Sequence, residues 1–189
     1  MKEKIKELLK QTEIAGIEDL IDWMENNGFF DAPCSSKYHL AQPGGLAEHS
    51  LNVFRAALDL SKALYADKIT FDFINSIIIC SLLHDLGKAG QFGKPAYSIT
   101  NQMSIDLVPG TAATYESNKE LLYVPHEVRS IAIASRFIEL TEEEQFAILY
   151  HNGLYGELKS FKGNETPLLL ILHHADMWAA RVIEKEETK

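Results

Sequence analysis

The sequence predicts an all-α protein whose helical core carries one short hairpin or loop insertion. Apolar residues recur every three to four positions along most of the 189 residues, which is the period of an amphipathic helix. The longest interruption lies between Lys88 and Pro125, where glycines and prolines are scattered among short β-prone segments. Hydrophobic residues make up 46% and charged residues 24% of the chain, so we expect a single globular domain with its own core.

The first elements are two short helices followed by a loop. Apolar residues at helical spacing run from Ile5 to Leu9 and, after a break at Ala15-Gly16, from Ile17 to Met24. Prolines and a glycine pair between Phe29 and Gly45 then indicate loops and turns.

Two longer helices come next, and the second is expected to be the most buried. The first spans Leu46 to about Ala66 and the second about Phe71 to Leu86. Isoleucines and leucines between Ile77 and Leu83 leave the second helix almost no polar face, so we expect it at the centre of the fold.

The interruption that follows is long for a compact domain. The segments Tyr97–Thr100 and Leu121–Val124 are short and β-prone, and we interpret the region as a long loop that carries a small hairpin. Because long loops in compact domains tend to be functional, we expect this one to cover a site.

Three helices complete the chain. One is expected over Glu127–Leu140, and Thr141 with Glu144 forms a capping box that starts the next, which ends at Asn152-Gly153. The last helix begins near Thr166-Pro167 and continues into the charged tail EKEETK.

Charge and targeting signals exclude several classes of function. Lys and Arg number 18 against 27 Asp and Glu, and this net charge of -9 argues against an extended nucleic-acid surface but allows a small phosphorylated substrate. Two cysteines, Cys34 and Cys80, do not make a disulfide framework. The N-terminus lacks a signal peptide and no run is long enough to span a membrane, so we expect a cytoplasmic protein without a membrane partner.

Histidines and aspartates beside apolar runs carry the chemistry. His84-Asp85 directly follows the apolar run that ends at Leu83, and a buried charge is costly unless it is paired or bound to metal. Imidazole and carboxylate together form a ligand set suited to first-row metals. Asp176 carries the same cost of burial, and its alternative role is a buried salt bridge to Arg55 or Arg181.

The order of three segments resembles the HD superfamily of metal-dependent phosphohydrolases. These segments are GGLAEHSLNV with His49, SLLHDLGK with His84 and Asp85, and LLLILHHADMWAAR with Asp176. The resemblance covers roughly residues 40 to 182. It implies an HD-domain helical core over residues 40–189, with residues 1–39 as an N-terminal helical extension packed on that core.

The resemblance also implies a metal centre. His49, His84, Asp85 and Asp176 match the ligands of one metal. His126 and His151 match extra histidines of members that bind two metals, and Asp85 would then bridge them. The expected cofactor is a divalent transition metal (Mn, Fe, Ni, Co or Zn, with Mg also allowed), two per chain.

The implied activity is hydrolysis of a phosphoester in a nucleotide or similar small phosphorylated metabolite. The attacking group would be metal-activated hydroxide, because a bound metal lowers the pKa of water from 15.7 toward about 7. Asp85 and Lys88 are the expected catalytic residues, the ammonium of Lys88 pointing at a phosphoryl group. The expected substrate-binding residues are Lys88, Lys94, Arg129 and His39.

Other interpretations remain open. A single-strand 3'-5' exonuclease is one, because GGLAEHSLNV also resembles the HD domains of such enzymes, although the acidic balance counts against it. An HD-type di-iron oxygenase would use the same ligand set, and a sensing or scaffold module would have a degenerate site. His173 shares a helix face with Asp176, which makes it a partner of a ligand or a substrate contact, whereas His174 turns away.

Overall fold

The computed structural model describes residues 1–108, 110–156 and 163–185, and within them the fold is helical, as predicted. Residues 186–189 of the expected charged tail lie outside the described residues. The longer helices are α1 (Lys2–Gln11), α2 (Ile17–Asn26), α3 (Gly45–Tyr65), α4 (Phe71–Leu83), α6 (His126–Ala134), α7 (Glu142–Tyr150) and α8 (Pro167–Trp178). Short helical turns are η1 (Ala66–Lys68), η2 (Leu86–Ala89), η3 (Gly153–Tyr155) and η5 (Ala179–Ile183).

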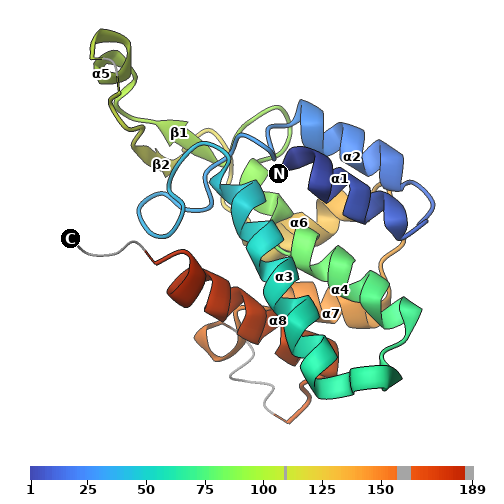
Figure 1. The fold of residues 1–189 in the computed structure, drawn as a ribbon. Coiled ribbons are helices and arrows are strands. Elements are labelled where there is room, and N and C mark those ends of the chain that lie inside the picture. The colour runs from blue at the N-terminus through green and yellow to red at the C-terminus, as the bar shows by residue number, and fades with distance from the viewer. Residues whose placement is uncertain (109, 157–162, 186–189) are drawn as a thin grey trace.

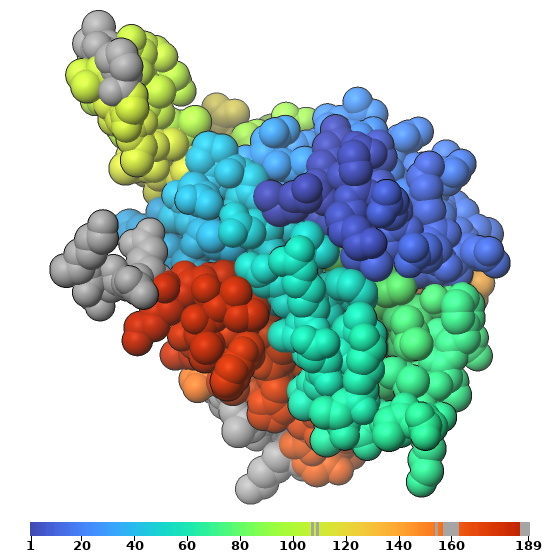
Figure 2. Space-filling model, viewed as in Figure 1, coloured from blue at the N-terminus to red at the C-terminus, as the bar shows by residue number. Residues whose placement is uncertain are grey.

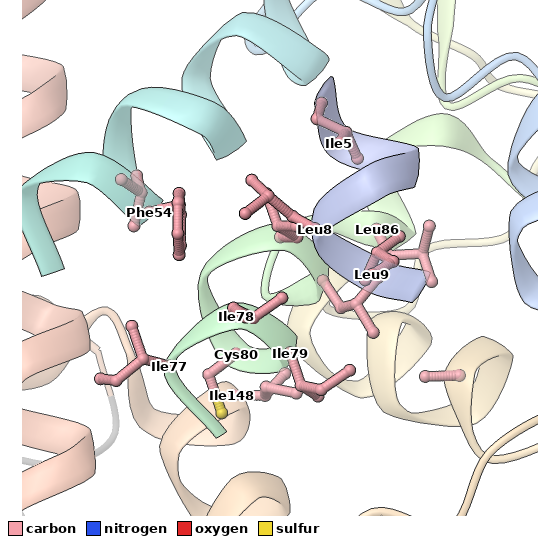
Figure 3. Close-up of a cluster of buried hydrophobic side chains, with 14 of the residues drawn as sticks. Ile5, Leu8, Leu9, Phe54, Ile77, Ile78, Ile79, Cys80, Leu86 and Ile148 are labelled. Carbon is pink, nitrogen blue, oxygen red and sulfur yellow. The ribbon is translucent and has the colours of Figure 1, made fainter. Parts of the chain in front are cut away.

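Helices α3, α4, α7 and α8 form the centre of the molecule. Helix α3 packs against both α4 and α8, and α7 packs against α4 and α8 (Figure 1). The apolar run of α4 is fully buried from Ile77 to Leu83, which confirms its predicted central position. Figure 3 shows Ile77, Ile79 and Ile148 in one cluster of apolar side chains.

The two N-terminal helices contribute to the same core. Ile5 and Leu9 of α1 and Leu20 and Met24 of α2 are each 0% exposed. Helix α1 contacts both α3 and α4, and Figure 3 shows Ile5 and Leu9 of α1 in the same apolar cluster as Leu86. Removing α1 would therefore expose apolar surface of the central helices.

The insertion contains the predicted short hairpin, and only the first of the two β-prone segments is a strand. Strand β1 (Tyr97–Ile99) pairs antiparallel with β2 (Tyr115–Ser117), and α5 (Gln102–Leu107) lies between them. The segment 121–124 forms no strand, because the carbonyl of Leu122 accepts a hydrogen bond from Arg129 and the Tyr123 side chain is 91% exposed. The tip of the hairpin projects away from the body (Figures 1 and 2). The base of the insertion, with Tyr97, lines a cavity together with Lys88 and His126, so whether the insertion covers a site stays a prediction.

Two helix ends also differ from the prediction. Helix α6 ends at Ala134 instead of Leu140, because Arg136 and Phe137 donate to carbonyls only three residues back, which tightens the chain into a turn. Helix α4 ends at Leu83, and the tighter turn η2 follows. The capping box at Thr141 and Glu144 is present as predicted. In the described ranges, no helix combines the length and the hydropathy needed to cross a bilayer.

Candidate metal centre

The centre is built around Asp85, just past the end of α4. The buried run of α4 carries the chain into the interior, and the Asp85 side chain there is 1% exposed. The ring of His84 donates from Nδ1 to the carbonyl of Ser81 (3.0 Å), which leaves Nε2 as the atom available to a ligand. The turn η2 closes with a hydrogen bond from the Lys88 amide to the Asp85 carbonyl (2.8 Å).

A close approach at Gly87 brings α6 to Asp85. The Gly87 amide donates to Ser130 Oγ (2.8 Å), and a Cβ added at Gly87 would lie 2.3 Å from the carbonyl oxygen of His126. Any side chain there would push η2 away from α6. The glycine therefore sets the distance between the first turn of α6 and Asp85.

We expect Gly87→Ala to destabilise the protein by about 1–3 kcal/mol or more, because the methyl group meets backbone that cannot move independently. Gly93→Ala is the control: a Cβ there meets no atom within 4 Å, and its left-handed φ of 71° is the only strain. Urea unfolding gives the free energy of unfolding of both variants and of the wild type. An equal decrease in the free energy of unfolding of the two variants would contradict a steric role for Gly87.

The histidines fall into two pairs, one at each oxygen of Asp85. Asp85 Oδ2 lies 3.4 Å from His84 Nε2 and 3.7 Å from His49 Nε2. Asp85 Oδ1 lies 3.1 Å from His126 Nε2 and 3.7 Å from His151 Nε2. The structure thus brings together all four predicted histidine ligands around one buried carboxylate.

Asp176 of α8 joins the first pair. Its Oδ1 lies 3.1 Å from His49 Nε2. Neither of the alternative ion-pair partners contacts it: Arg55 donates to Asn52 (3.4 Å), and Arg181 lies over the ring of Tyr155. Burial would raise the pKa of Asp176, but the hydrogen bond with His49 and nearby histidines hold that pKa well below its usual range.

The unsatisfied polar atoms of this region fit a bound cation. Among the described residues, four buried side-chain polar atoms lack a hydrogen-bond partner: Ser81 Oγ, His84 Nε2, Asp85 Oδ1 and His126 Nε2. The last two lie 3.1 Å apart without hydrogen-bond geometry, as expected for atoms that face a shared position instead of each other. Because an unpaired buried acceptor is costly, a metal that accepts these lone pairs suits the donor set.

The pKa values of His49 and His151 are shifted in opposite directions. Burial would lower the pKa of His49, but its hydrogen bonds with Asp176 and Glu184 outweigh burial and raise that pKa to about 9. Burial, together with the nearby charge of His84, lowers the pKa of His151 to about 3. His151 is therefore a neutral ring at physiological pH, which is the form that binds metal.

Lys88 is the cation closest to Asp85. Its Nζ donates to Asp85 Oδ2 over 2.6 Å. Burial opposes the charge of Lys88, but the Asp85 carboxylate raises the Lys88 pKa well above its ordinary value. Burial likewise opposes ionisation of Asp85, and Lys88 with the surrounding histidines holds the Asp85 pKa well below its usual range. Both groups stay charged.

The structure places His39 and Arg129 beside this centre and Lys94 further away. His39 lines a cavity of about 180 Å³ that also contacts Asp85, Lys88 and Asp176. Arg129 lines a neighbouring cavity of about 470 Å³ with Lys88 and His126, and it donates to Leu122 O and Gln91 Oε1. Lys94 donates instead to the carbonyl of Glu120 (2.8 Å), in a third cavity that reaches Lys88 but none of the histidines.

His173 and His174 lie as their spacing predicts. His173 donates from Nδ1 to the carbonyl of His151 (2.8 Å), so it is a partner of the residue that could bind metal. His174 is exposed.

Two residues of the site were missed in the sequence. The carboxylate of Glu184 accepts from His49 Nδ1, and Tyr97 lies beside Lys88 in the neighbouring cavity. Glu184 belongs to a charged stretch that is typical of a solvated tail, so no local signal distinguished it. Tyr97 begins the β-prone segment of the insertion, which is the one signal that pointed to it.

Comparisons with known proteins agree with the resemblance found in the sequence. The family model of the HD domain matches residues 46–186. Searches of curated proteins and of solved structures gave no match. The match covers about three quarters of the chain and includes all six predicted metal ligands, whereas His39 lies before it. The chain therefore belongs to the HD domain family, whose members are in general metal-dependent hydrolases.

Proposed function

We propose that this protein is a metal-dependent phosphohydrolase that cleaves a phosphoester of a nucleotide or similar small phosphorylated metabolite. The observation that carries the proposal is the position of Asp85. One of its oxygens faces His49 and His84, and the other faces His126 and His151. A carboxylate that separates two histidine pairs is suited to bridging two cations.

The first cation would be held by His49, His84, Asp85 and Asp176. Ligand atoms of His49, His84 and Asp85 lie within 4.8 Å of one another, as do those of Asp85, His126 and His151. The second group would hold the second cation. A divalent transition metal (Mn, Fe, Ni, Co or Zn) or Mg there supplies Lewis-acid stabilisation of a phosphoryl oxygen and activation of water.

The residues around the ligands suit an anionic substrate. Lys88 lines both the smaller cavity, which Asp85 also lines, and the neighbouring cavity beside His126, so its ammonium can hold a phosphoryl oxygen while it stays paired with the carboxylate. His39 lines the smaller cavity. Arg129 is 4% exposed, and its two hydrogen bonds with Gln91 and Leu122 are to neutral acceptors, so its charge is available to a second anionic group.

Replacing both His126 and His151 by Ala is expected to reduce the metal content from two per chain to one. His49 and His84 lie closest to Oδ2 of Asp85, whereas His126 and His151 lie closest to Oδ1, so the substitutions would remove the two rings at Oδ1. Elemental analysis at saturating metal measures the stoichiometry. One metal in both the variant and the wild type would instead assign these histidines to the substrate or the fold.

The activity itself is tested by loading the metal-free protein with each divalent metal in turn and offering a panel of phosphorylated metabolites. Release of inorganic phosphate or of a nucleotide supports the proposal. Shortening of a single-stranded oligonucleotide from its 3' end would support the exonuclease instead. A redox-active iron pair, seen by electron paramagnetic resonance during substrate turnover, would support an oxygenase. Metal-loaded protein that hydrolyses nothing in the panel would contradict the proposal.

A further inference from the structure

Glu184 holds His49 from the side opposite to the predicted metal. The carboxylate of Glu184 accepts from His49 Nδ1 at 3.0 and 3.1 Å, while His49 Nε2 faces Asp85 and Asp176. The side chains of Glu184 and His49 are each 1% exposed. The two residues are 135 positions apart in the chain, so this contact depends on the complete fold.

Neighbouring groups hold the Glu184 carboxylate in place. Asn52 Nδ2 donates to Glu184 Oε1 (3.1 Å), and Asn52 in turn accepts from Arg55 (3.4 Å). His39 Nε2 lies 3.8 Å from Glu184 Oε2. Because these groups lie on α3 and on the segment before it, the carboxylate has little freedom to rotate away from His49.

A local change in helix type brings Glu184 to this position. In a continuous α-helix, the eight residues from Asp176 to Glu184 advance by roughly 800°, which leaves the two side chains about 80° apart. The chain instead forms the π-helical turn η5, and the Glu184 amide donates to the carbonyl of Ala179, five residues back (2.9 Å). Since a π turn is wider and advances less per residue, it rotates Glu184 toward the face that carries Asp176.

We propose that Glu184 is the positioning residue of the metal centre: it fixes the orientation and the tautomer of His49. Because Nδ1 donates its hydrogen to the Glu184 carboxylate, Nε2 is the nitrogen left to bind a metal once it gives up its own proton, and Nε2 faces Asp85 and Asp176. A carboxylate behind a ligating imidazole also increases the basicity of the ring. This proposal rests on the proposed metal site, and it adds a residue that contacts neither metal nor substrate.

The test is the affinity of the metal-free protein for Mn²⁺, measured from the electron paramagnetic resonance signal of free Mn²⁺. Glu184→Ala is expected to weaken binding at the tighter position by about 10- to 100-fold. Glu184→Asp keeps the charge but shortens the side chain, so it is expected to weaken binding several-fold. Glu48→Gln is the matched control, because Glu48 precedes His49 in the chain but its side chain contacts Gln42. The Mn²⁺ affinity of this variant should equal that of the wild type.

The possible outcomes separate a positioning role from a structural one. A residue that only tethers the end of the chain would lower the free energy of unfolding without changing the affinity of the folded protein. Wild-type affinity in both folded Glu184 variants would overturn the proposal while leaving the phosphohydrolase intact. If Glu184→Ala does not fold, the Asp variant decides in the same way. A wild-type protein that binds no Mn²⁺ or other divalent metal would instead overturn the proposed function.

Discussion

Asp85→Asn is expected to remove both metals and to reduce hydrolysis at least ~1,000-fold. The amide preserves the shape of the side chain but is neutral, so both histidine pairs lose the anion that they share. Losing several kcal/mol of metal stabilisation of the transition state corresponds to a rate loss of about this size.

Elemental analysis and steady-state kinetics measure the two effects of this substitution. Asp59→Asn is the control. Asp59 is exposed on α3, so its replacement makes the same change in charge away from the site. An Asp85→Asn protein that is free of metal yet fully active would rule out the metal-dependent mechanism. Retention of both metals would show that Asp85 does not bridge them.

Lys88→Ala is expected to lower kcat by about 100- to 1,000-fold, the range observed when one charge-stabilising group is removed from an active site. Its metal content should stay at the wild-type level. Lys88 donates to Asp85, so its removal leaves that carboxylate at least as negative and does not weaken its attraction for a cation.

The comparison that isolates Lys88 uses Lys68→Ala, which removes an exposed lysine from η1. Measuring kcat together with metal content distinguishes substrate stabilisation from ligand support. Wild-type kcat in Lys88→Ala would place Lys88 outside the reaction. Loss of metal in that variant would assign it a role in holding Asp85.

The sequence predicted elements that depend on local chemistry. Apolar residues from Ile77 to Leu83 are buried as their lack of a polar face indicates, and Thr141 caps α7 through its hydroxyl. The end of α6 could not be predicted in the same way, because apolar residues such as Ile138 continue past it and pack on the core from a turn. Apolar spacing reports burial and does not distinguish a helix from the turn that follows it.

In the site, too, some residues could be predicted from local sequence and others could not. His84-Asp85 was recognisable from its position behind a buried run, whereas the association of His49 with Asp176 required a family resemblance, because no local pattern relates residues so far apart. Glu184 had neither signal. Its burial depends on a π turn and on a histidine at the other end of the domain, and both are properties of the tertiary structure.

The distribution of the predicted ligands along the chain would make metal binding a measure of folding. His49 lies on α3, His84 and Asp85 follow α4, His126 begins α6, His151 follows α7 and Asp176 lies on α8. An unfolded chain scatters these groups, so only the native state offers the complete set. By mass action, free metal at a hundred times its Kd stabilises the native state by about 2.7 kcal/mol. The concentration of free metal would then determine how long the protein resists proteolysis, as well as its catalytic rate.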